Sequence, residues 1–181
     1  MAFLVVAVVI VGCVSVLNVL LLSAVIRRLR EHNDAITRLQ TFAPGFTLAV
    51  GTRVGDFAAT TIADEPVTRD ALTAEESLVA FFSARCDSCR EHLPSFVQYA
   101  KSSGGPDRVL AVIAEGDGPT EDLIEALRPV AQVVLEPEQG TLAALFGVGG
   151  FPSFFTLDRR GRVTAAAPVV DDLPAADPAI A

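Results

Sequence analysis

Two cysteines separated by two residues are the most reactive pair of side chains in this sequence. The stretch Cys86-Asp87-Ser88-Cys89 follows an apolar run at 78–83 that is typical of a strand, and helical spacing of apolar residues follows it. A cysteine at the start of a helix lies beside unpaired backbone N–H groups and the positive end of the helix dipole, which stabilise a thiolate. We therefore predict thiol–disulfide exchange, in which Cys86 attacks a disulfide and the more buried Cys89 releases the mixed disulfide.

The residues beside the cysteines carry opposing charges. Arg85 favours a thiolate at Cys86, whereas an ionised Asp87 disfavours it. The side chains of Asp87 and Ser88 are also of the kind that binds the first N–H groups of a helix. We expect Arg85, Asp87 and Ser88 to modulate the cysteine pair, and the direction of exchange does not follow from them.

Other uses of a cysteine pair require further residues. A structural zinc site needs four ligands, and besides carboxylates residues 51–168 offer only His92 in addition to the two cysteines. Covalent haem attachment needs a histidine directly after the second cysteine, where Arg90 stands. We interpret His92 as a solvated helix residue and expect neither a metal nor a cofactor. The third cysteine, Cys13, lies in an apolar N-terminal run, where we expect a small packing residue.

The N-terminal part of the chain differs in character from the rest. Phe3 to Ile26 is an apolar run of 24 residues without a charged side chain, which is long enough to cross a bilayer as a helix. A cleaved signal peptide is the alternative, but the run is longer than a signal requires and no basic residue precedes it. The segments that we expect are a membrane anchor at 1–26, a juxtamembrane helix and linker at 27–50, a folded domain at 51–168 and a flexible tail at 169–181.

The charged residues follow the same division. Residues 1–40 carry a net charge of +2 and residues 41–181 one of −10, which together give the −8 of the chain. An acidic domain without clustered Lys and Arg argues against nucleic acid as a partner. Arg27, Arg28 and Arg30 directly follow the apolar run, and by the positive-inside rule they favour a domain in the cytosol.

The pattern of the domain alternates between strand and helix signals. Apolar runs typical of strands lie at 57–62, 67–68, 78–83, 108–114, 133–135, 153–157 and 162–166. Helical spacing or helix-start residues lie at 91–101, 119–130 and 139–146. This alternation predicts an α/β domain with a central sheet flanked by helices.

In order and spacing these motifs resemble the thioredoxin superfamily, and within it the membrane-anchored TlpA-like and MauD-like disulfide reductases. The resemblance covers about residues 50–168, and its motifs lie at 50–57, 78–90 and 145–162. It implies a thioredoxin-like fold with a central mixed sheet. It also implies that Pro152 is a cis-proline beside the cysteines, and that the backbone around Phe151 binds an extended segment of the substrate.

The resemblance further implies partners and a location. Such proteins reduce or rearrange disulfides in exported proteins, so we expect protein thiol or disulfide clients and a redox partner that recycles the dithiol. They usually face outward. We therefore expect a single-pass protein of the cell membrane, with residues 3–26 in contact with the lipid bilayer. We expect its domain to be extracytoplasmic, although the arginines after the apolar run favour the cytosol.

Three positions depart from this family. Arg85 replaces a tryptophan before the first cysteine, Ala80 replaces a buried carboxylate of thioredoxin itself, and residues 171–181 replace a final helix, so that one edge is open or covered by a partner. Two other functions stay open. One is a peroxiredoxin-like thiol peroxidase, which shares the pattern at 50–57 and a residue like Ser83. The other is a non-catalytic membrane-anchored module that uses the fold to bind a partner.

Overall fold

The computed structural model describes residues 12, 48–116 and 118–174 of the 181-residue chain. Apart from Gly12, these residues belong to the second of two units of the chain, Thr41–Ala181. Within these described ranges, no helix has both the length and the apolar character needed to cross a membrane. The predicted anchor apart from Gly12, most of the predicted juxtamembrane segment and the last part of the predicted tail lie outside the described residues.

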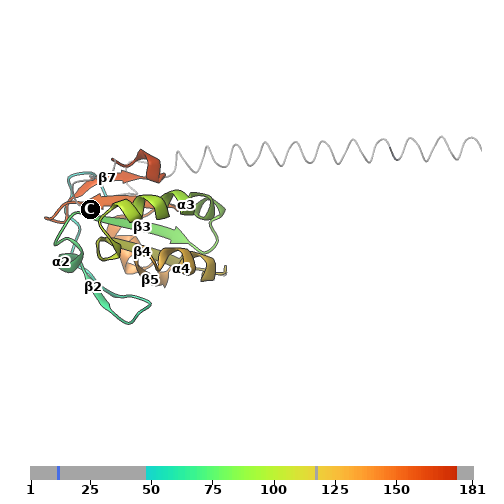
Figure 1. Cartoon of the computed structure of the whole chain (residues 1–181), viewed down its shortest axis with the longest axis horizontal. Coiled ribbons are helices and arrows are strands. Elements are labelled where there is room, and N and C mark those ends of the chain that lie inside the picture. The colour runs from blue at the N-terminus through green and yellow to red at the C-terminus, as the bar shows by residue number, and fades with distance from the viewer. Residues whose placement is uncertain (1–11, 13–47, 117, 175–181) are drawn as a thin grey trace, which may run out of the picture. The chain divides into compact units, whose positions relative to one another are not determined.

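A five-stranded mixed sheet forms the centre of the domain (Figure 1). Its strands are β3 (Ser77–Ser83), β4 (Val109–Glu115), β5 (Gln132–Pro137), β6 (Ser153–Leu157) and β7 (Val163–Ala167). They lie in the order β5-β4-β3-β6-β7, with β3, β4 and β5 parallel to one another and β6 antiparallel to both β3 and β7. The predicted α/β class is therefore confirmed.

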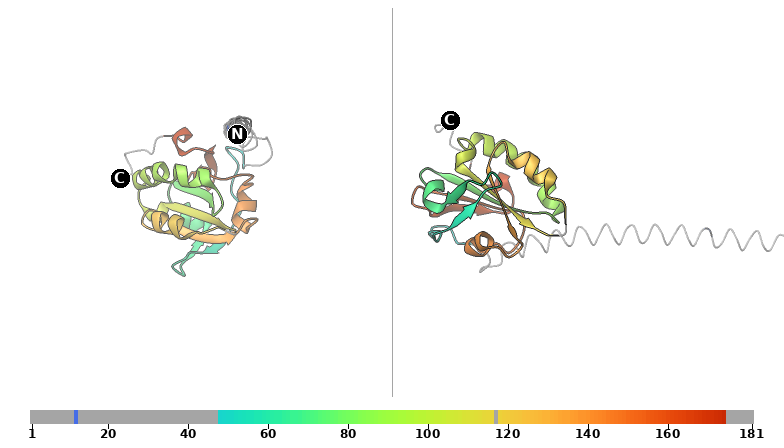
Figure 2. Two further views of the ribbon diagram at one scale, coloured as in Figure 1. Left: turned by 90° about the vertical axis from the view of Figure 1, so that its right-hand side faces the viewer. Right: turned by 90° about the horizontal axis from the view of Figure 1, so that it is seen from below.

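Helices cover both faces of this sheet (Figure 2). On one face lie α3 (Asp87–Ser102), which joins β3 to β4, and α4 (Glu121–Leu127), which joins β4 to β5. Two right-handed crossovers that proceed in the same direction place their helices on the same side. The other face is covered by α5 (Thr141–Phe146), which joins β5 to β6, and by α2 (Arg69–Leu72).

Six buried phenylalanines fasten the helices to the two central strands. Consecutive side chains of a strand point to opposite faces, so β3 and β6 each place one ring on either side of the sheet. One trio is Phe82, Phe96 and Phe154, and the other is Phe81, Phe146 and Phe155. Ring centroids within each trio lie 5.1–5.8 Å apart. The helix after the cysteines and the helix before Pro152 thus pack on the same strands from opposite sides.

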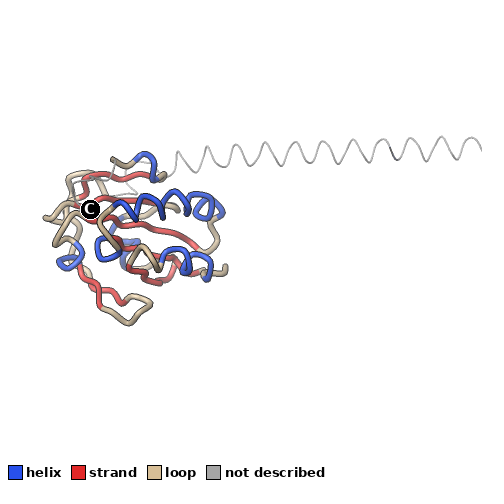
Figure 3. The backbone as a smooth tube through the Cα atoms, viewed as in Figure 1, coloured by secondary structure: helices blue, strands red, loops and turns tan. Residues whose placement is uncertain are grey.

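A short hairpin stands beside the main sheet (Figure 3). Its strands β1 (Ala58–Thr60) and β2 (Pro66–Thr68) are antiparallel, as the runs at 57–62 and 67–68 predicted. The four-residue helix α2 and two 3₁₀ turns, η1 (Pro106–Arg108) and η2 (Val170–Asp172), were not predicted.

The segment after β7 packs against the domain. Val170 and Leu173 are only 1% and 7% exposed and belong to the apolar cluster under α3. Tyr99 of α3 donates a hydrogen bond from its hydroxyl to the carbonyl of Pro174 at 2.6 Å. Within the described residues up to Pro174, the short 3₁₀ turn η2 follows β7, and the rest of the predicted tail lies outside the described residues. The packed core therefore extends past residue 168, to Leu173.

Candidate active site

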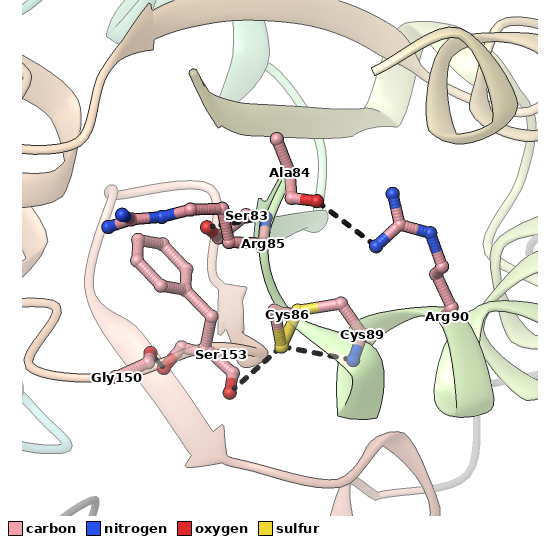
Figure 4. Close-up of a disulfide and its surroundings, with 9 residues drawn as sticks. Ser83, Ala84, Arg85, Cys86, Cys89, Arg90, Gly150 and Ser153 are labelled. Atoms are coloured by element: carbon pink, nitrogen blue, oxygen red, sulfur yellow. Dashed lines mark hydrogen bonds between the residues drawn. A yellow bond between two sulfur atoms is a disulfide. The ribbon is translucent and has the colours of Figure 1, made fainter. Parts of the chain in front are cut away.

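The cysteine pair lies where β3 passes into α3 (Figure 4). Cys86 is the N-cap residue of α3, with φ −99° and ψ 103°, and its Sγ accepts a hydrogen bond from the backbone N–H of Cys89 at 3.1 Å. Cys86 is partly exposed, whereas Cys89 is completely buried. The two residues form a disulfide, with their Cα atoms 5.2 Å apart. The predicted placement at a helix start and the predicted difference in burial are both confirmed.

This placement favours negative charge on one of the two sulfurs. The N–H of Cys89 that now points at Cys86 Sγ will bind a thiolate there once the disulfide is reduced, and the dipole of the 16-residue α3 acts in the same sense. Cys89 receives no such help, because it lies inside the apolar cluster below α3. Chemically, the arrangement provides an accessible nucleophile with a second thiol one helical turn behind it.

A second loop reaches the cysteines from β6. Because β6 is antiparallel to β3 and pairs Ser153 with Phe81, the residues just before Ser153 lie at the same end of the sheet as the cysteines. The peptide bond between Phe151 and Pro152 is cis, as the resemblance implied. The carbonyl oxygen of Phe151 lies 3.5 Å from Cys86 Sγ, so in the dithiol form the Cys86 thiol can donate a hydrogen bond to it.

Arg85, which the sequence predicts to favour a thiolate at Cys86, has its side chain paired with another residue in the structure. Its guanidinium points away from both sulfurs (Figure 4) and forms an ion pair with Glu138, which lies 53 residues further on in the loop between β5 and α5. The backbone N–H of Arg85 donates to the hydroxyl of Ser83 at 3.4 Å. Sequence reasoning missed Glu138, since no local pattern links residues so far apart.

Asp87 and Ser88 lie exposed in the first turn of α3. We expected their side chains to compete for the first N–H groups of the helix, but the sulfur of Cys86 occupies that position. The influence of the Asp87 charge on the Cys86 thiolate stays a prediction.

Arg90 fastens the start of α3 to its surroundings. Its guanidinium donates to the carbonyl oxygens of Ala84 and Pro119, each at 3.0 Å, and forms an ion pair with Asp122 of α4 at 2.6 Å. Figure 4 shows the bond to Ala84. The hydrogen bond from Arg90 is the main reason why the pKa of Asp122 lies below its ordinary value of 3.8. Sequence reasoning did not identify this anchor of the active-site helix.

The surroundings of Cys89 are apolar. Ala80 is buried in the same cluster, so the carboxylate that thioredoxin carries at this position has no counterpart there. The one buried carboxylate among the described residues, Glu136, lies elsewhere and accepts hydrogen bonds from the N–H groups of Leu142 and Ala143 at the start of α5. Within the described ranges, no three His, Cys, Asp or Glu side chains gather in a way that could hold a metal ion.

Comparisons with known proteins identify the fold. No protein-family model and no curated protein sequence matches this chain. Among solved structures, the thioredoxin domain of a thiol-disulfide oxidoreductase from Bacteroides vulgatus has a TM-score of 0.56 and 22% identity, covering 70% of this chain and 94% of its own. A protein from Chlorobium tepidum, described as a thiol:disulfide interchange protein DsbE, has a TM-score of 0.50 and 28% identity, covering 66% and 85%. A thio-disulfide isomerase from Thermus thermophilus has a TM-score of 0.54 and 24% identity, covering 67% and 87%.

The described domain therefore has a thioredoxin-like fold, and the solved structures that resemble it include thiol-disulfide oxidoreductases. This confirms the expected fold at the level of the superfamily. The narrower TlpA-like or MauD-like assignment and the membrane anchor stay predictions.

Proposed function

We propose that this chain is a thiol–disulfide oxidoreductase that exchanges disulfides with client proteins through Cys86 and Cys89. The observation that carries the proposal is the geometry of the pair. A partly exposed sulfur caps a helix next to the carbonyl of Phe151, and a buried cysteine lies one helical turn behind it.

The exchange proceeds in two steps when the chain acts as the reductant. The Cys86 thiolate attacks one sulfur of a client disulfide, forming a mixed disulfide while the other client sulfur leaves as a thiolate. Cys89 then loses its proton and attacks Cys86 Sγ, so that the Cys86–Cys89 disulfide forms and the second client sulfur leaves. Two electrons pass to the client, whose thiolates take up protons from solvent. A redox partner carrying a dithiol then reduces the pair again.

Phe151 and Pro152 form the proposed contact with the client. The carbonyl of Phe151 lies beside Cys86 Sγ, and in this proposal the backbone of an extended client segment pairs with the chain here as an added strand. Such pairing uses backbone groups only, which suits a protein with several clients.

We also propose that residues 3–26 anchor the chain in the cell membrane, that its domain faces outward, and that it is of the TlpA-like or MauD-like kind. The support is the 24-residue apolar run together with the family resemblance. Arg27, Arg28 and Arg30 then lie at the interface, where they bind lipid head groups.

Trapping of the mixed disulfide tests the exchange reaction. A Cys89→Ser variant can form the mixed disulfide with a client but cannot release it. We therefore expect covalent adducts with client proteins in membranes, and a reductant should cleave these adducts. The matched Cys86→Ser variant lacks the nucleophile and should trap none. An intact Cys89→Ser chain without adducts would favour a binding module, and peroxide reduction that survives Cys89→Ser would favour a thiol peroxidase. The trapped proteins would also identify the clients.

A further inference from the structure

We propose that Glu138 is a positioning residue of the exchange site: by pairing with Arg85, it holds the arginine's charge away from the Cys86 sulfur. A thiolate without a nearby cation is less stable, and a dithiol with a less stable thiolate is a stronger reductant. The ion pair therefore makes the dithiol more reducing than it would be if Arg85 had no carboxylate partner. The inference rests on the proposed thiol–disulfide exchange and concerns how strongly the site reduces.

The topology of the sheet brings the two charges together. The strands β3, β4 and β5 are parallel, so the segments that follow them lie at one edge of the sheet. Arg85 follows β3, Gly116 follows β4 and Glu138 follows β5. A Cβ at Gly116 would lie 3.2 Å from Glu138 Oε1 and 3.3 Å from Arg85 Nε. The ion pair therefore crosses closely over Gly116, and a larger residue there would crowd it.

The loop that carries Glu138 is held by the fold. Two residues before it, the buried carboxylate of Glu136 accepts hydrogen bonds from the N–H groups of Leu142 and Ala143 at 3.0 and 2.8 Å. A Cβ at Gly140 would collide with this carboxyl group. The loop is thus fixed to the start of α5, and Glu138 meets Arg85 without the entropy loss of ordering a free loop.

The pair is better suited to placing charge than to stabilising the fold. The side chains of Arg85 and Glu138 are 55% and 42% exposed, and ion pairs with such exposure contribute little to stability. Arg85 directly precedes the nucleophile, however. A guanidinium so close in the chain can approach the Cys86 thiolate once its carboxylate partner is removed, and an opposite charge within about 4–6 Å stabilises the charged form.

Other charged groups near the site do not replace Arg85. Those on the neighbouring described segments are Asp87, Arg90, Glu91 and His92 of α3, Glu115 at the end of β4, and Glu121 and Asp122 of α4. Arg90 is bound to Asp122 and to the carbonyl of Ala84, which fixes its guanidinium. Among the described residues, the guanidinium of Arg85 is held by the carboxylate of Glu138 alone, whereas that of Arg90 has three partners.

A double-mutant cycle in the full chain tests the proposal. The chain is purified in detergent with Cys13→Ala, then reduced, and the rate of Cys86 alkylation is followed against pH. We expect Glu138→Gln to lower the midpoint by about 0.5–1 pH unit, because the released arginine stabilises the thiolate. At a pH well above the midpoints, the equilibrium with glutathione should move about three- to tenfold toward the dithiol. In an Arg85→Gln background, Glu138→Gln should have little further effect.

Two results would overturn the proposal. An unchanged midpoint in Glu138→Gln would mean that Glu138 does not control the Arg85 charge. An equal shift in the Arg85→Gln background would mean that Glu138 acts through its own charge. Glu65→Gln in the β1–β2 turn removes the same charge away from the site and should leave the midpoint unaltered. Because alkylation needs no client, these results stand even if trapping shows that the chain does not exchange disulfides.

Discussion

The contrast between the two cysteines arises from their positions on one helix. An N-cap residue has extended backbone, so the side chain of Cys86 stands at the helix end, beside solvent and the free N–H groups. Cys89, Phe96 and Ala100 follow at helical spacing on the stripe of α3 that faces the sheet, and all three are buried. This contrast supports the proposed roles, in which Cys86 attacks the client disulfide and Cys89 releases the mixed disulfide.

Glu136 provides a stability prediction at the scale of a single residue. The residue is 8% exposed, and each of its carboxylate oxygens accepts one N–H of α5. In Glu136→Gln the amide keeps one acceptor, but its NH₂ group faces the second N–H. We expect the free energy of unfolding to fall by about 1–3 kcal/mol. Because the chain contains no tryptophan, urea unfolding is best followed by circular dichroism.

The control for Glu136→Gln is a glutamate outside the core. Glu65→Gln changes the same groups on an exposed residue and should stay within about 0.5 kcal/mol of the parent. If both variants unfold at the same urea concentration, the two hydrogen bonds of Glu136 do not stabilise the domain, and the loop that presents Glu138 is held by other contacts.

Residues of the site differ in how far the sequence reveals them. The cysteines can be identified from their spacing and from the apolar run before them, and Pro152 can be identified from the family resemblance. Arg85 was recognised, but its partner was not. Glu136 and Glu138 are two acidic residues among many, and only the parallel pairing of β3, β4 and β5 shows that one is buried and the other meets Arg85.

At the scale of elements, one arginine joins the two helices on the active-site face. Arg90 of α3 lowers the pKa of Asp122 in α4 below its ordinary 3.8, mainly through their hydrogen bond. A carboxyl group whose pKa is lower in the folded state stabilises the fold above its unfolded pKa, and this contribution disappears as pH falls through the folded value. The link between the helices should therefore weaken only in acid.

An Asp122→Asn variant tests this link. At neutral pH it should unfold more easily than the parent, by at most about 1 kcal/mol, since the Asp122 side chain is 49% exposed and solvent screens the pair. The two proteins should become equal once the pH has fallen below the lowered pKa of Asp122, because Asp122 is then protonated in the parent as well. Urea unfolding from neutral to acid pH measures the difference. A difference that is constant over this range would show that the ion pair contributes nothing.

Elements were predictable where their hydrophobic pattern is long. The run at 153–157 matches β6, and the other six predicted strands all occur with ends shifted by a few residues. The structure begins α3 at Asp87 instead of 91, because Cys86 acts as its cap, and α4 is shorter than the predicted 119–130. The short elements α2 and η2 were missed because three or four residues are too few to show a hydrophobic periodicity. Such short elements form because of their contacts with the rest of the fold.

At the scale of the whole molecule, the compartment in which the domain lies decides what a dithiol can do there. In the cytosol thiols are kept reduced, so a disulfide reductase there has few structural disulfides to act on. Outside, disulfides persist, and a reductant in that compartment depends on a partner that supplies electrons. The proposed outward domain therefore requires such a redox partner, whereas a cytosolic domain can use soluble thiols.

Labelling of Cys86 in intact cells determines the side directly. In a chain with Cys13→Ala and Cys89→Ser, Cys86 is the single thiol, and a membrane-impermeant maleimide added after mild reduction should modify it without lysis. The same chain with Cys86→Ser must stay unlabelled, and a cytosolic thiol protein reports on cell integrity. Labelling that requires lysis would place the domain in the cytosol. The positive charges of Arg27, Arg28 and Arg30 would then have been the better guide than the family resemblance, and the clients would have to be sought among cytosolic proteins.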